Sequence, residues 1–225
     1  FTDRLERLTY AEIEADFTLQ RVAMAAGKSL FTTHCRACHP MAKLMQQTTV
    51  FPKNCPACHQ HNTVRLPRTV DPSKARWIYG GRYETILETI RHGRRGYMPP
   101  YREVLSFSER EALAHYVLSL SGIATDATKT QQGRILFHAE TAACHYCHGS
   151  DGKGRQDIGA ANLTDQIWLW TEVPGQPNLQ AQVSAIHEVI DRGLNHDGMP
   201  AWENRLSPLQ IKLLALYIHA LAGGT

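Results

Sequence analysis

Cys35-Arg36-Ala37-Cys38-His39 contains a pattern that returns at Cys55-Pro-Ala-Cys58-His59 and at Cys144-His-Tyr-Cys147-His148. These three Cys-x-x-Cys-His motifs contain all 6 cysteines of the 225-residue chain. In this pattern, two thiols one helical turn apart add to the vinyl groups of a haem, and the histidine that follows binds the iron. The sequence therefore predicts three covalently attached c-type haems.

Cys-x-x-Cys also occurs in zinc sites, in redox-active disulfides and in structural disulfides. A zinc site pairs two such motifs and has no use for a histidine directly after each one, and a thioredoxin-like motif needs a βαβ pattern that we do not find here. Haem attachment therefore explains all three motifs better than these alternatives. We expect thioether bonds at the cysteines and iron ligation at the adjacent histidines, that is, at Cys35, Cys38, Cys55, Cys58, Cys144 and Cys147, and at His39, His59 and His148.

The composition is that of an ordinary globular protein, with 43% hydrophobic residues. No run of 18 or more apolar residues is present, so no membrane-spanning segment is predicted in the chain. The first seven residues are charged and amphipathic, which is not typical of a signal peptide. We interpret this start as processed or excised, with a membrane anchor cut away.

The formal net charge of +3 does not point to nucleic acid as a partner, because three haems would add six negatively charged propionates. The charges are unevenly distributed. Residues 1–125 contain 17 Lys and Arg against 11 Asp and Glu, whereas residues 126–225 contain 7 against 10. A basic docking surface for a charged partner and an ordinary solvated surface both fit this distribution.

An internal repeat organises the chain. Gly27–Phe31 precedes the first motif, and Gly133–Phe137 precedes the third in the same way. The two Met-Pro dipeptides at 98–99 and 199–200 each precede a closing apolar helix. We therefore predict two tandem domains, 1–125 and 126–225, joined by the polar segment 124–130, with the second haem motif in an insertion at about residues 40–66 of the first domain.

The sequence predicts helices separated by long irregular loops. Apolar residues recur at helical spacing over residues 8–26, 108–120 and 207–221, and serine caps precede the last two segments. Alternation typical of strands is absent. A loop as long as residues 40–76 is compatible with a compact domain if haem provides part of the core. The predicted fold class is all-α, with haem-filled cores and long loops.

Met98 and Met199 are the predicted second ligands of two haem irons, because they occupy equivalent places in the two repeats. The alternative role for these methionines is to fill gaps in the core. The short spacing from Gly27 to Cys35 favours a pairing of the first motif with Met98, and a pairing of Met98 with the Cys55 haem stays open. Met199 would serve the third motif.

The middle haem, on the second motif, has no Met-Pro of its own. His61 cannot reach the far side of its own haem, because two residues extend at most about 7 Å. The candidates that remain are His34, Met41, Met45 and His92. We favour His34, with Met45 second; the alternative is a solvent-facing His34. Histidine ligation would give this haem a lower reduction potential than the His/Met haems.

The tryptophans of the two repeats are candidates for contacts with haem. Trp77 lies in the first repeat, and Trp168 and Trp170 lie in the second. Donation of an indole N–H to a propionate and packing against a haem edge are both possible roles.

With these motifs placed, the sequence resembles the periplasmic part of the haem-binding subunit III of cbb3-type cytochrome c oxidases over about residues 10–224. The resemblance is carried by segments 27–31, 77–81, 90–99 and 116–122 in the first repeat, and by segments 147–154, 162–165, 167–169, 199–200 and 217–218 in the second. It implies two tandem class I cytochrome c domains with His/Met haems, at the periplasmic face of the inner membrane and behind a membrane anchor absent from this chain. The implied partners are a soluble donor cytochrome c and the mono-haem and catalytic subunits of the oxidase.

This chain departs from the family pattern at three places. It has a third haem motif, it lacks the glycine that usually follows the histidine equivalent to His39, and it has Ala160-Ala161-Asn162 where a proline tends to precede Asn-Leu. The last change affects the carbonyl group that orients His148, and so the basicity of that ligand. The third motif implies a three-haem variant with an added relay or storage site.

The resulting functional hypothesis is an electron relay that is not an enzyme by itself and has no catalytic residues. One alternative is a multihaem periplasmic enzyme, either peroxidase-like or thiosulfate-oxidising, which would need an open coordination position. Another is the cytochrome subunit of a periplasmic dehydrogenase, although that architecture typically uses one domain for each haem.

Overall fold

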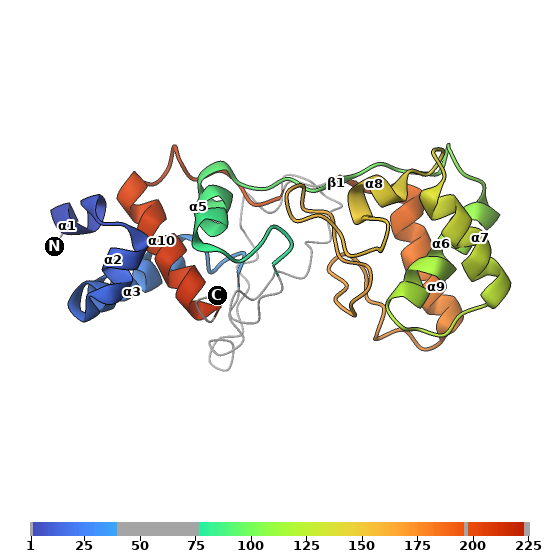
Figure 1. The fold of residues 1–225 in the computed structure, drawn as a ribbon, viewed down its shortest axis with the longest axis horizontal. Helices are drawn as coiled ribbons and strands as arrows, with labels where there is room; N and C mark the ends of the chain where they lie inside the picture. The colour runs from blue at the N-terminus through green and yellow to red at the C-terminus, as the bar shows by residue number, and fades with distance from the viewer. Residues whose placement is uncertain (1, 40–76, 196–197, 223–225) are drawn as a thin grey trace. The chain divides into compact units, whose positions relative to one another are not determined.

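The structure is a computed structural model of the chain, and it describes residues 2–39, 77–195 and 198–222 (Figure 1). Helices dominate these residues, which confirms the prediction of a mostly helical protein. The helices are α1 (Thr2–Arg7), α2 (Tyr10–Ala15), α3 (Phe17–His34), α5 (Tyr83–His92), α6 (Phe107–Leu120), α7 (Ala127–His138), α8 (Cys144–His148), α9 (Leu179–Arg192) and α10 (Pro208–Leu221), and the strands are β1 (Tyr97–Met98) and β2 (Leu194–Asn195).

The starts of the two closing helices follow from local sequence. Ser106 accepts a hydrogen bond from the backbone of Glu109, whose side chain bonds back to the serine, and this capping box begins α6. Ser207 and Gln210 form the same box at the start of α10. Both helices lie within one residue of their predicted bounds.

The single helix predicted over residues 8–26 is wrong. Asp16 has extended backbone between α2 and α3, and its carboxylate caps α3 by accepting hydrogen bonds from the amides of Thr18 and Leu19. α3 then continues to His34, directly before the first haem motif. Periodicity alone missed the break because apolar residues continue on both sides of the cap.

The chain forms two compact units. Unit 1 contains residues 1–95 and 198–225, and unit 2 contains residues 96–197. This division differs from the predicted boundary between residues 125 and 126. Each unit joins the start of one repeat to the end of the other, so the closing helices α6 and α10 are exchanged between the repeats.

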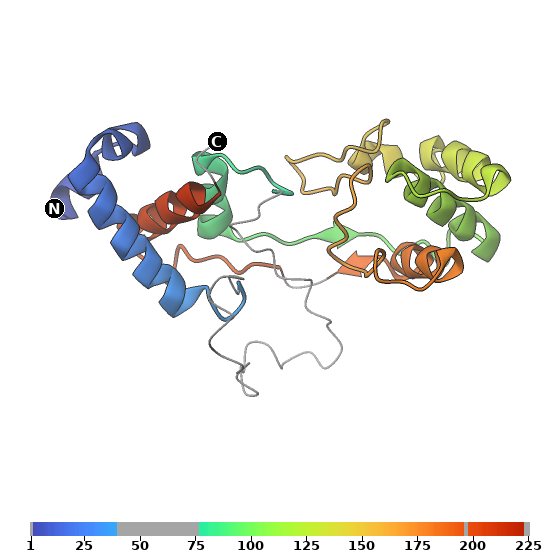
Figure 2. The same ribbon diagram turned by 90° about the horizontal axis from the view of Figure 1, so that it is seen from below.

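The short connection between α6 and α7 gives the physical reason for this difference. Residues 121–126 join the two helices, and such a short loop favours helices that pack against each other as neighbours. α6 accordingly packs on α7 and α9, in unit 2. α10 packs on α3 and α5, in unit 1 (Figures 1 and 2).

The core of unit 1 forms where α3 crosses α10. A Cβ atom on Gly27 would lie 2.4 Å from the carbonyl oxygen of Leu213, so the close helix crossing requires glycine. One turn later, the buried Phe31 packs on Tyr217 with ring centroids 5.8 Å apart. A second apolar cluster, around Ile13, packs the N-terminal helices onto this pair.

The core of unit 2 repeats this arrangement where α7 crosses α6. A Cβ atom on Gly133 would lie 2.0 Å from the carbonyl oxygen of Ala112. Phe137, at 1% exposure, packs edge-on against Tyr116 with centroids 5.2 Å apart. The glycine and phenylalanine shared by the two repeats therefore have the same structural role in both units.

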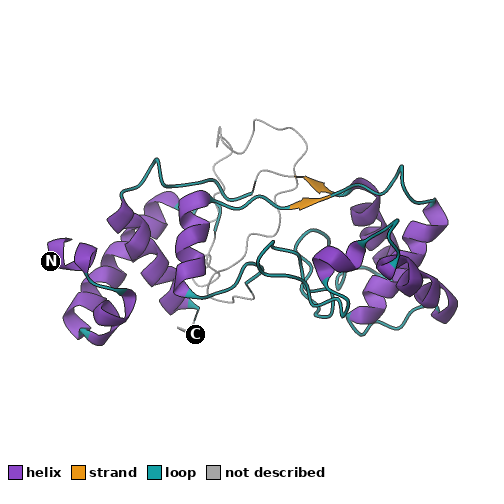
Figure 3. Cartoon of the chain, turned by 45° about the horizontal axis from the view of Figure 1, so that its top comes forward, coloured by secondary structure: helices purple, strands orange, loops and turns teal. Residues whose placement is uncertain are grey.

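Two short strands fix the position of Met98 in unit 2. β1 and β2 pair antiparallel, with Tyr97 opposite Asn195 and Met98 opposite Leu194 (Figure 3). The strands are too short for apolar alternation to be visible in the sequence. None of the helices in the described ranges combines the length and the apolar character that crossing a bilayer requires.

Candidate haem sites

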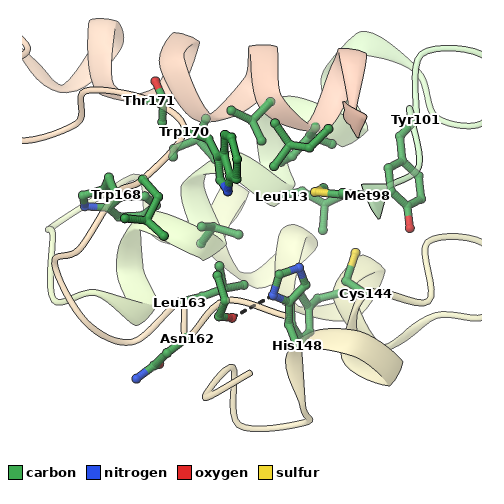
Figure 4. A pocket seen from close by; sticks show the side chains of 18 of the residues that line it. Met98, Tyr101, Leu113, Cys144, His148, Asn162, Leu163, Trp168, Trp170 and Thr171 are labelled. Atoms are coloured by element: carbon green, nitrogen blue, oxygen red, sulfur yellow. Dashed lines mark hydrogen bonds between the residues drawn. The ribbon is translucent and has the colours of Figure 1, made fainter. Parts of the chain in front are cut away.

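A pocket in unit 2 lies beside the third Cys-x-x-Cys-His motif. It contains about 820 Å³ of space outside protein atoms, part of it open to solvent. Its walls are largely apolar side chains of α6, α7 and α9 and of the loop at residues 161–171, together with Cys144, His148 and Met98 (Figure 4). Such a cavity, apolar with a few convergent polar groups, is typical of a cofactor site.

His148 is held in a defined orientation at one wall of this pocket. Its Nδ1 lies 2.9 Å from the carbonyl oxygen of Ala161, so Nδ1 carries the proton and donates it to that oxygen. Burial lowers the pKa of His148, an effect that the bond to Ala161 opposes. The imidazole is therefore neutral at pH 7, and its other nitrogen points into the pocket, available to a metal (Figure 4).

The sulfur of Met98 faces His148 across the pocket (Figure 4). Met98 is held there by its pairing with Leu194 in β2 and by the residues that follow it. The backbone amide of Tyr101 donates to the carbonyl oxygen of Ile190, 3.0 Å away, at the end of α9. Methionine and histidine thus approach one cavity from opposite walls, which is the donor set of a six-coordinate His/Met haem.

The two cysteines of the third motif also fit a tethered haem. α8 places Cys144 and Cys147 one helical turn apart and on the same helix as His148. Cys144 lines the pocket, and burial raises its pKa to about 11. The free thiol is therefore protonated at neutral pH and forms part of the pocket wall.

A buried N–H group without a hydrogen-bond partner provides a further test of whether a haem fits the pocket. The indole Nε1 of Trp168 is buried and has no hydrogen-bond partner within the described parts of the chain. Trp168 belongs to the pocket lining, and the sequence identified it as a candidate donor to a propionate. A buried N–H without a partner is rare in folded proteins and indicates a missing acceptor. The residues of unit 2 therefore fit a haem.

The structure corrects the predicted pairing of the methionines. Met98 was expected beside the first motif, but it lines the pocket of the third motif. Met199 instead lies in unit 1, where it packs against the cluster that contains Phe31 and Cys35. The reason is the exchange of the closing segments, which carries each Met-Pro dipeptide into the unit of the other repeat.

Unit 1 brings the first motif to the core. Cys35 is 8% exposed, and burial raises its pKa to about 11. The ring of His39 lies 6.5 Å, centroid to centroid, from that of Phe31. The second motif (Cys55, Cys58 and His59) and the candidates Met41 and Met45 lie outside the described residues.

The candidate ligands of the middle haem that the structure describes lie in unit 1. His34 is exposed, and its ring centroid lies 5.8 Å from that of Trp202. His92 lies 3.1 Å from a carboxylate oxygen of Glu88 and 3.4 Å from one of Glu203. His34 as an iron ligand therefore stays a prediction, and His92 already has two acidic partners.

Sequence reasoning did not name two groups that shape the unit 2 pocket. The first is the carbonyl oxygen of Ala161, because the resemblance placed the acceptor of His148 near residues 160–162 without saying which residue presents it. The second is Tyr101, which lines the pocket and whose hydroxyl donates to the carbonyl oxygen of Ala142, 2.6 Å away and just before the third motif. The Met-Pro-x-Tyr spacing at residues 98–101 was the only signal for it.

Fold and site together define a mostly helical protein of the cytochrome c type. The family described as cytochrome c oxidase, cbb3-type, subunit III, matches residues 42–117 and 128–218. The chain belongs to this family. The first matched segment begins after His39 and includes the second motif, which favours that motif as the family's own, whereas the burial of Cys35 favours the first.

Curated relatives agree with this membership. The chain is 32% identical to the cbb3-type cytochrome c oxidase subunit FixP of Sinorhizobium medicae, over 95% of this chain and 65% of the relative. It is 34% identical to FixP of Bradyrhizobium diazoefficiens, over 95% and 66%, and 35% identical to subunit CcoP of Rubrivivax gelatinosus, over 89% and 55%. The chain thus spans between about half and two thirds of the length of these relatives.

Proposed function

We propose that this chain is the electron-carrying part of the c-type haem subunit of a cbb3-type cytochrome c oxidase. The observation that supports it most is the unit 2 pocket, where Met98 and His148 face each other beside two cysteines. Family membership and the names of the relatives agree with this role. The chain would carry electrons for an oxidoreductase complex and would not itself catalyse a reaction.

In unit 2, Cys144 and Cys147 would tether a haem c, with His148 and Met98 as iron ligands. A haem c supplies an iron that changes valence by one electron. The bond from His148 to Ala161 fixes the ring and makes the imidazole a better donor to iron. The thioether of Met98 and the apolar walls both raise the reduction potential, because they stabilise the less charged ferrous state.

In unit 1, Cys35, Cys38 and His39 would hold a second haem, with Met199 as the other ligand. The burial of Cys35 and the packing of Met199 against its cluster support this assignment. The reverse assignment, with Met199 on the haem of the second motif, is the alternative that the family match supports.

A third haem would be attached at Cys55, Cys58 and His59, with His34 as its proposed second ligand and Met45 as the alternative. An imidazole in place of a thioether gives a lower potential. This haem would then act as an added relay or storage site beside the two His/Met haems.

The proposed path begins at a soluble donor cytochrome c and ends at the mono-haem and catalytic subunits of the oxidase. The proposed location is the periplasmic face of the inner membrane. The cbb3 oxidase names of the relatives support other oxidase subunits as partners. No role in nucleic-acid binding is proposed.

Near-infrared magnetic circular dichroism of the oxidised, haem-loaded chain tests the proposal. We expect methionine-to-iron bands equivalent to two haems, loss of one band in Met98→Ala and loss of one in Met199→Ala. We also expect the reduced protein not to bind carbon monoxide rapidly. Rapid binding at a five-coordinate iron, with no methionine bands, would instead indicate a multihaem enzyme and would refute the electron-relay proposal.

A further inference from the structure

In both units, the segment after the Met-Pro dipeptide docks on the end of a helix through the same backbone bonds. In unit 2, the amide of Arg102 donates to the carbonyl oxygen of Asp191 in α9, 3.2 Å away. In unit 1, the amide of Glu203 donates to the carbonyl oxygen of Arg91 in α5, also 3.2 Å away. The two backbone sites are equivalent, so they do not by themselves decide which segment docks where.

The side chains at the unit 2 site have opposite charges. Asp191 is 7% exposed, and its carboxylate lies 3.0 Å from Nη2 of Arg110, which is equally buried, and 2.9 Å from Nε of Arg102. Arg110 also donates to the carbonyl oxygens of Arg102 and Leu105, and so ties the docked segment to α6. Hydrogen bonding to Arg102 and the nearby positive charges lower the pKa of Asp191, so the carboxylate is charged at neutral pH.

The unit 1 site carries the inverse charges. Arg91 occupies the place of Asp191, and Glu203 occupies the place of Arg102. The carboxylate of Glu203 lies 3.4 Å from Nδ1 of His92, the neighbour of Arg91. The buried Ile211 replaces Arg110, so no second cation lies at this position.

The alternative arrangement, in which each segment returns to the helix of its own repeat, would bring like charges together. Arg102 and the buried Arg110 would then meet Arg91, and Glu203 would meet a buried Asp191 with no cation. Like charges in contact are unfavourable, and a buried carboxylate without a partner is more so. Hydrophobic packing adds to this distinction, because Leu213 and Leu216 of α10 pack against the N-terminal helices of unit 1, and α6 has Ala112 and His115 at the equivalent positions.

We propose that these docking charges, Arg102, Arg110 and Asp191 in unit 2 with Arg91 and Glu203 in unit 1, select the exchanged pairing and so direct Met98 to unit 2 and Met199 to unit 1. They are positioning residues for the methionines. The proposal goes beyond electron transfer, and its test does not depend on which ligands the irons have.

The test uses the haem-loaded chain with a protease recognition sequence inserted after the exposed Ala124. After cleavage, size-exclusion chromatography shows whether the two fragments stay together. In the exchanged fold each unit needs both fragments, so they should co-elute. The first variant, called the arm variant, is R102E/R110I/E203R/I211R. It exchanges the charges of the two docking segments, and its fragments should separate. The matched variant adds R91D/D191R, which restores opposite charges, and its fragments should co-elute again.

Co-elution of the arm-variant fragments would overturn the proposal, and so would separation of the matched-variant fragments, because either result shows that charge does not decide the pairing. If the arm variant fails to fold, R102E/R110I and R102E/R110I/D191R replace it. The double variant should lower the urea midpoint at which the cleaved fragments separate, and D191R should recover that midpoint. No recovery would overturn the proposal. The methionine bands of the same samples report separately on haem ligation.

Discussion

Replacing Gly193 by alanine should displace Met98 from the proposed haem pocket of unit 2. Gly193 ends α9 with a φ of +63°, and an added Cβ atom would lie 2.4 Å from the carbonyl oxygen of Met98 and 2.6 Å from the amide nitrogen of Pro100. Both contacts are with backbone, so no side chain can turn away to relieve them. The segment that carries Met98 would have to move.

The expected cost has two parts. The backbone of Gly193, with φ +63° and ψ −171°, lies in a region essentially limited to glycine that costs an alanine about 1–3 kcal/mol, and forcing an extra methyl group against packed atoms costs about 1–3 kcal/mol more. Gly122 provides the matched control, because its φ is +83° and a Cβ atom there would meet nothing within 4 Å. Gly122→Ala should therefore show the cost of a positive φ without the steric clash.

Thermal unfolding measures the loss of stability, and the near-infrared methionine bands report whether Met98 still binds iron. In a unit of this size, each 1 kcal/mol lowers the Tm by about 4–8 °C. We expect Gly193→Ala to unfold at least about 4 °C below Gly122→Ala and to lose the Met98 band, whereas Gly122→Ala keeps it. Equal melting temperatures with both bands intact would show that Met98 is not held against Gly193, and would refute the reasoning.

Four further predictions follow from the structure. In a chain whose third motif cannot attach haem, Met199→Ala should abolish the remaining methionine band and Met98→Ala should leave it unchanged; the opposite result would restore the pairing expected from sequence. His34→Ala should convert one haem to the high-spin state and spare both methionine bands, and an unchanged spectrum would exclude His34 as a ligand. Trp168→Phe should change the pH dependence of the reduction potential of the unit 2 haem if the indole donates to a propionate, and an unaltered dependence would contradict that contact. Burial lowers the pKa of His115, so the unfolded chain takes up the proton first, and stability should fall as the pH drops below about 6.5; His115→Asn should reduce this fall, as measured by Tm against pH.

The parts of the fold that the sequence predicted depend on local signals. Ser106 and Ser207 begin helices through capping boxes, and each box is formed by residues three positions apart. These boxes are therefore visible in sequence without knowledge of the tertiary structure. The glycines at 27 and 133 were visible only as markers of the repeat, because their role at helix crossings depends on the distant carbonyl groups of Leu213 and Ala112.

The exchange of closing helices could not be predicted in the same way. Both repeats have a Met-Pro dipeptide, a serine cap and an apolar helix in the same order, so either partner satisfies the pattern. Proximity along the chain then favoured the wrong pairing for Met98. The distinguishing signal is the charge at Arg102 and Asp191, whose meaning depends on two helix ends that sequence analysis had not brought together.

The haem pocket was predictable to the extent that side chains define it. Cys144 and His148 were predicted together, and Met98 was predicted as an iron ligand but for the haem of the first motif, because the chemistry of these residues is specific to residue type. The acceptor for His148 is the backbone carbonyl oxygen of Ala161, and any residue could present that group. Its identity follows from the path of the loop and not from the residue type.

Mass spectrometry of the intact chain, produced with a c-type haem maturation system, tests the central claim most directly. The account predicts a single species heavier than the polypeptide by three haems, with one haem in each fragment that contains a Cys-x-x-Cys-His motif. A mass that corresponds to two haems or fewer would contradict it.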